Sequence, residues 1–356
     1  MAKKKRVTLP KAFNELIEAG DTEALIALYT QCDLNATYDG RFGLNTALHH
    51  RDVPIELIFW LAEQGADINA RNYYGQTPLH AQAACGGEAV KALVDLGGDL
   101  NATDKDGGTP LHAAARYFRA DTVRLLVEKG ANITARNARG QSPLAVALSA
   151  CRNIDIPQAA EISAELLQAG EAVTLDMLEN VKRIGQEFEF HRERFSKERL
   201  AEVDAGLERL YSLFNVTPVA QRRVHDGASP IVVAEGPWRE QYETLWNLLV
   251  PSSGPATTMQ GEAIRIAGRV HDEIRRNGGV NWDQDYRLML SALEQHFASG
   301  TPLADDKLKE ARTLIATLSA SGSSGHGATE SLCELSVLWV AANPMPIVLE
   351  APAYTR

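Results

Sequence analysis

The sequence predicts an all-α protein in which a solenoid of helical repeats is followed by a separate small helical domain. Two observations lead to this fold class. Three similar segments recur at nearly constant spacing between residues 74 and 145, and a new set of amphipathic helical patterns begins at Gly236. A period of this length is typical of stacked helix pairs, since one pair cannot bury its apolar faces alone. Such a solenoid directs the search for function to a binding surface.

The repeated segments share a Thr-Pro-Leu-His motif. It is complete at residues 77–80 and 109–112, and it is degenerate at residues 142–145, where Ser and Ala replace Thr and His. The first positions of the three copies lie 32 and 33 residues apart. Threonine suits the N-cap of a helix and proline its first turn, where the missing N–H costs nothing. The leucine is expected to point into the stack.

This motif, together with the similar endings at residues 65–70, 97–102 and 130–135, resembles the ankyrin-repeat family. The resemblance implies that His80 and His112 have a structural role. It also implies that partners bind a concave face, which is made of the inner helices and of the tips of the loops between repeats, called fingers. An earlier copy opens at residues 46–49, with alanine in place of proline. We therefore expect four repeats and a protein-binding function.

The predicted organisation has six parts. They are N-terminal cap helices (1–36), four ankyrin repeats (37–174), C-terminal capping helices (175–215), a linker (216–235), a helical domain (236–320), and a linker with an extended tail (321–356). Proline and glycine between short apolar runs mark the first linker. The last repeat carries an insertion at residues 151–157. In the tail, prolines among β-branched residues predict an extended arm.

Candidate partner-binding residues are those that the motif leaves free on the concave face. They are Arg41, Phe42, Tyr73, Tyr74, Gln76, Lys105, Asp106, Arg116, Tyr117 and Arg139. Aromatic and arginine side chains are the residue types that most often anchor protein interfaces. The alternative is that the outer tyrosines only pack against neighbouring fingers.

The helical domain contains a second candidate cluster of polar residues. Its members are Gln260, Glu262, Arg265, Arg269, Asn281 and Asp283. This stretch resembles a domain of uncharacterised bacterial proteins, a resemblance that implies no site. Glu262 and Arg269 lie about two helical turns apart on nearly one face. We expect a buried polar network, and a ligand-binding, catalytic or partner-contact role remains the alternative.

Composition narrows the class of protein. The chain has 46 acidic and 36 basic residues and a formal net charge of −10, which disfavours a general nucleic-acid binder. The four cysteines have no paired or metal-type spacing, and neither a cofactor nor a metal site is expected. No stretch is apolar enough to span a membrane or to act as a leader. These features predict a cytoplasmic protein.

Together the patterns favour a non-catalytic protein that recognises another protein, with a basic partner as one option. The bacterial resemblance adds the hypothesis of an immunity or adaptor protein. The alternative is an enzyme whose activity resides in the C-terminal helical domain and whose repeats recruit its substrate.

Overall fold

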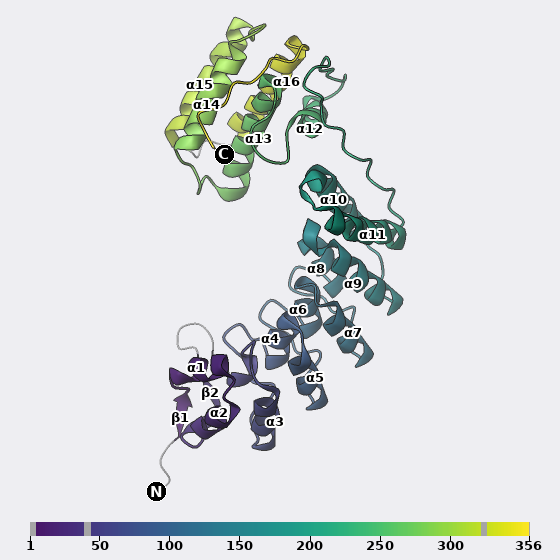
Figure 1. Ribbon diagram of the computed structural model, residues 1–356, viewed down its shortest axis with the longest axis vertical. Helices are drawn as coiled ribbons and strands as arrows, with labels where there is room; N and C mark the ends of the chain where they lie inside the picture. The colour runs from purple at the N-terminus through teal and green to yellow at the C-terminus, as the bar shows by residue number, and fades with distance from the viewer. Residues whose placement is uncertain (1–4, 39–43, 322–325, 356) are drawn as a thin grey trace. The chain divides into compact units, whose positions relative to one another are not determined.

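The computed structural model describes residues 5–38, 44–321 and 326–355. Within these ranges the chain is mainly helical, and the predicted all-α solenoid class is confirmed (Figure 1). The chain divides into two compact units. The first contains residues 1–188 and 195–219, and the second contains residues 189–194 and 220–356.

The first unit begins with a helical pair flanked by two short parallel strands. The elements are β1 (Arg6–Thr8), α1 (Ala12–Ala19), α2 (Thr22–Leu28) and β2 (Cys32–Thr37). The Leu9 N–H donates to the Thr37 carbonyl at 2.8 Å, beside the end of β1. The sequence predicted the helices but not the strands, because segments of three and six residues show no clear alternation of apolar and polar positions.

Helix pairs then stack along the chain. The bounds are η1 (Ala47–His49) with α3 (Ile55–Glu63), α4 (Pro78–Cys85) with α5 (Glu88–Asp95), α6 (Pro110–Arg116) with α7 (Ala120–Glu128), and α8 (Pro143–Ala150) with α9 (Ile156–Gln168). After them come α10 (Leu175–His191) and α11 (Lys197–Phe214). The inner helices α4, α6 and α8 pack on one another in sequence, and α11 packs on α9 (Figure 1). The motif leucines Leu79, Leu111 and Leu144 are fully buried between the pairs.

Each motif histidine connects its own repeat to the next one. The Thr77 N–H donates to His80 Nδ1 at 3.1 Å, and His80 Nε2 lies 3.0 Å from the carbonyl oxygen of Gly108. Because Nδ1 accepts a hydrogen bond, Nε2 carries the proton and donates to that carbonyl. The same bridges run from His49 to Gln76 and from His112 to Gln141, at 3.1 and 3.0 Å.

The fingers between repeats are joined through their backbones. The Lys105 N–H donates to the Tyr74 carbonyl at 2.9 Å, and the Ala138 N–H donates to the Asp106 carbonyl at 2.7 Å. Gly107 lies beside the second of these bonds with a φ of 72°, and a Cβ there would come within 3.1 Å of the Ala138 nitrogen. This position therefore requires glycine.

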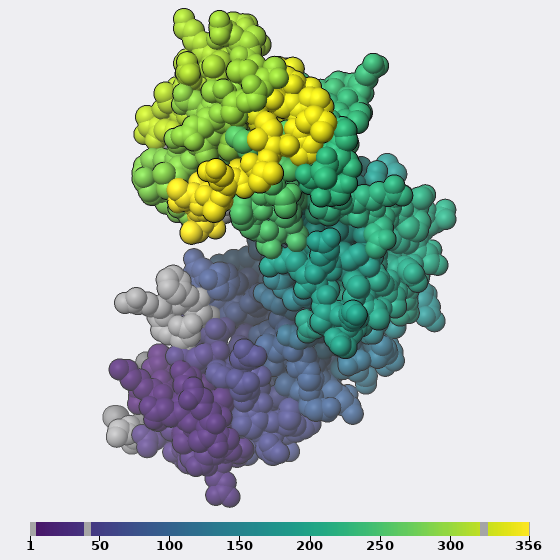
Figure 2. Space-filling view, turned by 45° about the horizontal axis from the view of Figure 1, so that its top comes forward, coloured from purple at the N-terminus to yellow at the C-terminus, as the bar shows by residue number. Residues whose placement is uncertain are grey.

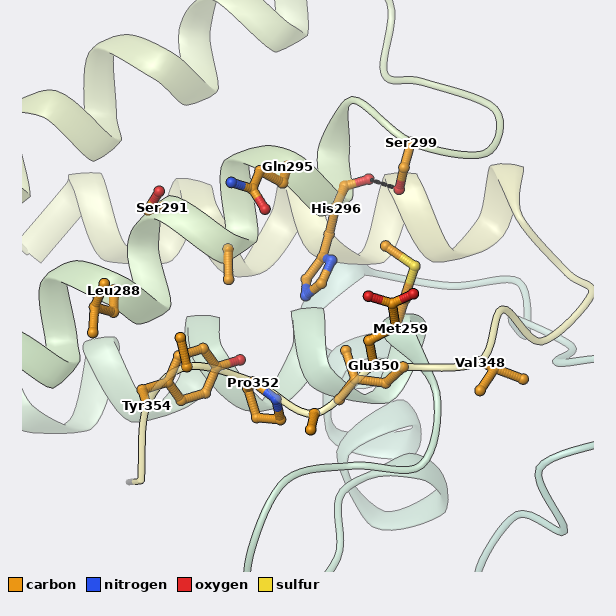
Figure 3. A pocket seen from close by; sticks show the side chains of 14 residues that line it. Met259, Leu288, Ser291, Gln295, His296, Ser299, Val348, Glu350, Pro352 and Tyr354 are labelled. Atoms are coloured by element: carbon orange, nitrogen blue, oxygen red, sulfur yellow. Dashed lines mark hydrogen bonds between the residues drawn. The ribbon is translucent and has the colours of Figure 1, made fainter.

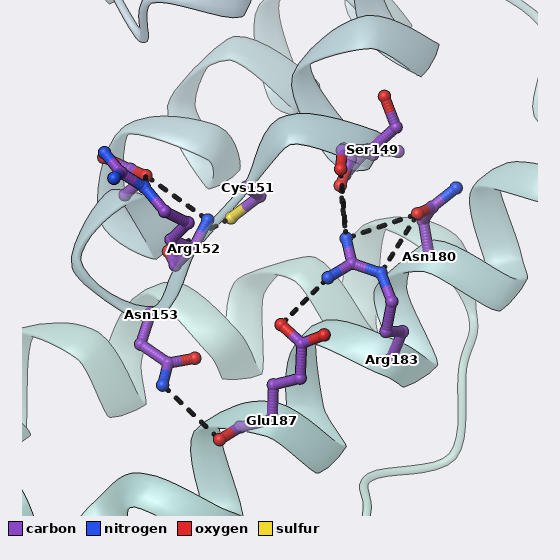
Figure 4. A network of polar contacts seen from close by, with 9 residues as sticks. Ser149, Cys151, Arg152, Asn153, Asn180, Arg183 and Glu187 are labelled. Atoms are coloured by element: carbon purple, nitrogen blue, oxygen red, sulfur yellow. Dashed lines mark hydrogen bonds and ion pairs between the residues drawn. The ribbon is translucent and has the colours of Figure 1, made fainter. Parts of the chain in front are cut away.

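Polar contacts fasten α10 to the end of α8 and to the insertion of the last repeat (Figure 4). Arg183 donates from Nη2 to the Leu148 carbonyl at 2.9 Å, and its Nη1 pairs with Glu187 at 2.9 Å. Asn153, within the short helix η2 (Asn153–Asp155), donates to the Glu187 carbonyl at 3.4 Å. The arginine thus satisfies a carbonyl that the end of α8 leaves without an intrahelical partner.

The second unit is built around α13. Its helices are α12 (Trp238–Leu249), α13 (Met259–Asn277), α14 (Gln284–Phe297), α15 (Asp305–Ser321) and α16 (His326–Ala342), and the short helix η3 (Arg192–Arg194) also belongs to it. Helix α13 packs against α12, α14 and α16. Gly268 permits the close approach of α12, because a Cβ there would lie only 2.4 Å from the Trp246 ring. The core includes the fully buried Met289, Leu293 and Trp339.

Two predictions about this unit need correction. Residues 321–356 were predicted as a linker and extended tail, but α16 occupies 17 residues of this range and supplies Trp339 to the core. Residues 216–235 were predicted as a linker, but Ile231 is buried in the second unit and its N–H donates to the Pro344 carbonyl at 2.7 Å. The extended tail was predicted from the prolines of residues 321–356. Those prolines, from Pro344 onward, all follow α16 and do not interrupt it.

Removing a buried motif leucine should destabilise the first unit. We expect Leu111→Ala to lower the free energy of unfolding by about 2–5 kcal/mol, because the side chain is fully buried and leaves a cavity. Chemical denaturation of the full chain measures this change. Leu175→Ala is the matched control, since Leu175 is 77% exposed. Equal effects of the two substitutions would show that the assigned repeat register is wrong.

The motif histidines should make the first unit sensitive to acid. Burial lowers the pKa of His49 to about 4 and lowers those of His80 and His112. The unfolded chain, with a histidine pKa near 6.5, then binds more protons than the folded chain. Stability should be complete above pH 6.5 and should fall as the pH drops toward 4, by about 1.4 kcal/mol per unit for a fully coupled histidine. Denaturation at pH 7 and pH 5 tests this, and equal stability at both would contradict it.

Candidate functional site

The first unit carries a hollow of about 810 Å³ on the side where the inner helices and the fingers meet. Predicted partner-binding residues that line it are Gln76, Asp106, Arg116, Tyr117 and Arg139. They come from three successive fingers and from the end of α6. The stacking of the repeats therefore brings together residues that lie up to 63 positions apart in the sequence.

The predicted partner-binding residues that line this hollow are partly or fully exposed. Tyr117 is 54% exposed, and Arg116 and Arg139 are also exposed. Within the ranges that the structure describes, neither arginine nor Asp106 takes part in an ion pair. An exposed charge that has no ion-pair partner within the protein can pair with a complementary group of a binding partner, and no internal ion pair has to be broken. The hollow thus combines an aromatic ring with charges of both signs.

Tyr73 and Tyr74 lie on the same finger as Gln76, and Lys105 lies on the same finger as Asp106, but none of the three lines the hollow. The rings of Tyr73 and Tyr74 meet edge to face with centroids 5.4 Å apart, and Lys105 Nζ lies 4.1 Å from the Tyr73 centroid. The two tyrosines are still 55% and 53% exposed. Part of the surface of each tyrosine is therefore in contact with neighbouring side chains, as the alternative interpretation expects. The rest of that surface is exposed beside the hollow. Arg41 and Phe42 lie outside the described residues.

The polar residues of the second unit do not all lie together: one cluster surrounds Glu262 on α13, and a second surrounds Glu273 near the end of that helix. The first is centred on Glu262, which is fully buried. Its carboxylate accepts hydrogen bonds from Arg265 Nε and Nη2 at 2.8 and 2.6 Å, from the Tyr354 hydroxyl at 2.6 Å and from the Ala256 N–H at 2.8 Å. Glu262 thus pairs with Arg265, one turn away. Arg269 is half-buried on the same helix.

The pKa of Glu262 reflects two opposing causes. Burial raises it, but the hydrogen bonds and the charge of Arg265, with those from Tyr354 and Ala256, outweigh burial and lower it below its usual range. The carboxylate therefore stays ionised. Four donors occupy the roughly four acceptor positions that a carboxylate offers. This saturation favours a structural network over a catalytic acid or base.

Gln260 extends the first cluster to the C-terminal segment. Its Nε2 donates to the carbonyls of Asn343 and Met345 at 2.9 and 2.7 Å, and its Oε1 accepts from the Ile347 N–H at 3.0 Å. One fully buried side chain thus satisfies three backbone groups of a segment more than 80 residues away.

Asn281 and Asp283 make their contacts away from Glu262. Asn281 donates from its backbone to Glu273 Oε1 at 2.7 Å and from its side chain to Oε2 at 3.2 Å. Asp283 caps α14 by accepting from the Asp285 N–H at 3.0 Å. The structure therefore does not bring them to Glu262. The sequence reasoning missed Glu273, although a carboxylate eleven residues after Glu262 lies on the same helical face.

The described part of the chain contains neither a cluster of candidate metal ligands nor a membrane-spanning helix. No three His, Cys, Asp or Glu side chains are grouped there as metal ligands would be. None of the helices in the described ranges has the length and apolar character needed to cross a bilayer.

Breaking the Glu262–Arg265 pair should strongly destabilise the second unit. We expect Arg265→Met to cost about 3–5 kcal/mol, because it leaves a buried carboxylate without its counter-charge. The double variant with Glu262→Gln should cost less than the sum of the two single changes. Arg312→Met is the control: its pair with Glu294 is exposed and should contribute at most about 1 kcal/mol. Additive losses in a urea-unfolding cycle would contradict a coupled network.

A comparison with known protein families identifies repeats within the first unit. Residues 47–137 and 81–158 match a family model described as ankyrin repeats (3 copies). No curated protein matches the chain. The match confirms the ankyrin resemblance of the Thr-Pro-Leu-His segments and does not extend beyond residue 158. The chain therefore carries an ankyrin-repeat array, a fold that supports the binding of other proteins.

Proposed function

We propose that this protein binds a partner protein through the concave face of its ankyrin array and has no catalytic role there. The observation that carries the proposal is the hollow lined by Gln76, Asp106, Arg116, Tyr117 and Arg139. None of these side chains is buried, whereas the motif residues Thr109 and His112 beneath them are. Residues that packing does not require thus form one continuous surface.

The chemistry of this surface suits a protein segment. Tyr117 offers a large amphipathic ring, and Arg116 and Arg139 each offer planar donors that match a carboxylate or a backbone carbonyl. Interface anchors are most often of these two types. The half-exposed Tyr73 and Tyr74, on the finger that carries Gln76, would lengthen the same contact.

The charge of the whole chain favours a basic partner. With a net charge of −10, a negative field attracts a cationic protein and speeds its association. A bacterial immunity protein that occludes a basic toxin, or an adaptor, fits this proposal, and either would act in the cytoplasm. A toxin gene beside the gene for this chain would favour immunity over an adaptor.

The alternative is an enzyme whose activity resides in the second unit and whose repeats recruit a substrate. The saturated carboxylate of Glu262 argues against that cluster as its active site. Turnover that is lost on Glu262→Gln while the fold is retained would favour the enzyme.

Site-specific photo-crosslinking tests the proposed face. A photoreactive phenylalanine analogue at Tyr117 should give a discrete crosslinked product in the native host. The same analogue at Lys91, an exposed position on the outer helix α5, should give none. Crosslinks from Lys91 alone would place the interface on the opposite side of the array.

Truncating the aromatic anchors should weaken binding without unfolding the array. For the partner identified in this way, we expect Tyr117→Ala and Tyr74→Ala each to cost about 2 kcal/mol or more in calorimetric titration. Both side chains are exposed, so the melting temperatures should stay close to that of the parent chain. Lys91→Ala should bind normally. Unchanged affinity in both tyrosine variants would remove the concave face from consideration.

A further inference from the structure

The second unit contains a cavity of about 490 Å³ that the proposed function does not use. It lies between α14 and the C-terminal segment, and it is lined by residues of both (Figure 3). Cavities of about 300–1,000 Å³ are typical of small-molecule sites. The lining combines apolar side chains with hydroxyl, amide, imidazole and carboxylate groups.

One wall of the cavity is a strap, defined as residues 350–353, that is fastened at its two ends. Before it, the Leu349 N–H donates to the Thr257 carbonyl at 3.4 Å. After it, the Tyr354 hydroxyl donates to Glu262 at 2.6 Å, and the Thr355 hydroxyl donates to Asp285 at 2.8 Å. In the described ranges the strap itself makes no hydrogen bond. Figure 2 shows this C-terminal segment, in yellow, on the surface of the second unit.

The opposite wall presents a buried imidazole. His296 on α14 is only 6% exposed, and among the described residues neither of its ring nitrogens has a hydrogen-bond partner. Its ring points from α14 toward the C-terminal segment in Figure 3 and stacks on Trp339 with centroids 6.4 Å apart. Burial lowers the pKa of His296, so the ring is neutral at neutral pH and keeps a free lone pair. A buried polar group without a partner is costly, and a ligand would supply one.

The charges around the cavity select the kind of ligand. Glu350 is exposed on the strap, and its carboxylate lies on the same side of the strap as His296 in Figure 3. Glu350 belongs to no ion pair within the described ranges. Glu262 and Arg265 do not line the cavity, and their charges compensate each other. The lining thus offers an unpaired carboxylate and an imidazole lone pair, with no unpaired cation to receive an anion.

We propose that this cavity binds a small primary amine with an apolar body. Its ammonium group would donate to the Glu350 carboxylate and to the free nitrogen of His296. Its body would pack against Met259, Leu288 and Pro352. An ammonium group has three donors and no acceptor, which matches the Glu350 carboxylate and the unprotonated ring nitrogen of His296, both of which are acceptors.

Three probes of matched shape test the proposal on the full-length chain. They are benzylamine, benzamide and benzoate, whose polar groups are cationic, neutral and anionic at pH 7.5. Saturation-transfer NMR should show benzylamine bound, benzamide bound more weakly and benzoate unbound. Equal signals from all three, or no signal from benzylamine, would overturn the proposal.

Variants then locate the binding. Glu350→Gln should raise the dissociation constant of benzylamine about tenfold, which corresponds to one lost charge interaction of about 1.4 kcal/mol. Ala292→Leu should abolish binding by filling the cavity that it lines. Glu334→Gln and Ala316→Leu are the matched controls, because both residues are exposed and outside the lining. Unchanged affinity in Glu350→Gln would refute the assigned ammonium position.

Discussion

The hydrogen bond from a motif histidine to the backbone of the next repeat sets the geometry of the first unit. His49, His80 and His112 each hold the start of their own inner helix through Nδ1 and the following finger through Nε2. A neutral, buried imidazole can do both at once, because it has one donor and one acceptor on opposite sides of a rigid ring. Each repeat is therefore complete only when its neighbour is in place.

A second type of contact between repeats lies at the other end of the inner helices. Gln82 donates to the Leu48 carbonyl at 2.9 Å, Arg119 to the Ala84 carbonyl at 3.0 Å, and Arg183 to the Leu148 carbonyl at 2.9 Å. In each case a polar side chain about 35 residues later satisfies a carbonyl at the C-terminal end of an earlier helix. The last of these contacts occurs where Ala145 replaces the motif histidine, so Arg183 fastens α10 to a repeat that has lost its usual bridge. Neither type of contact uses the side chains of Arg116 and Tyr117 on the concave face, so these side chains stay exposed.

How far the sequence predicts this structure depends on whether a pattern is local. The Thr-Pro-Leu-His copies locate the inner helices within a residue, because N-cap and first-turn preferences act within one helical turn. The hollow could also be predicted, since a fixed period places finger residues such as Asp106 and Arg139 side by side. Helix α16 was missed: it is buried on several sides and shows no amphipathic period from which to predict it.

Only part of the network around Glu262 can be predicted from local spacing. Arg265 lies one helical turn away, within reach of Glu262, but the Tyr354 hydroxyl comes from a position 92 residues away. A tail treated as an extended linker could not supply that hydroxyl. His296 could not be singled out from the sequence either. A single histidine on an amphipathic helix becomes informative only when its ring nitrogens are found buried without hydrogen-bond partners.

The buried charges of the second unit therefore have a consequence beyond the packing of α13. An ion pair at this depth costs desolvation free energy that its own attraction barely offsets, so its retention calls for further hydrogen bonds. Tyr354 supplies one of them, and in doing so it fixes the end of the strap that forms one wall of the cavity. Gln260 fixes the segment that leads to the other end. Two buried polar side chains, Gln260 and Glu262, lie two residues apart on α13 and thus determine where the last residues of the chain lie, and with them the shape of the space that faces His296.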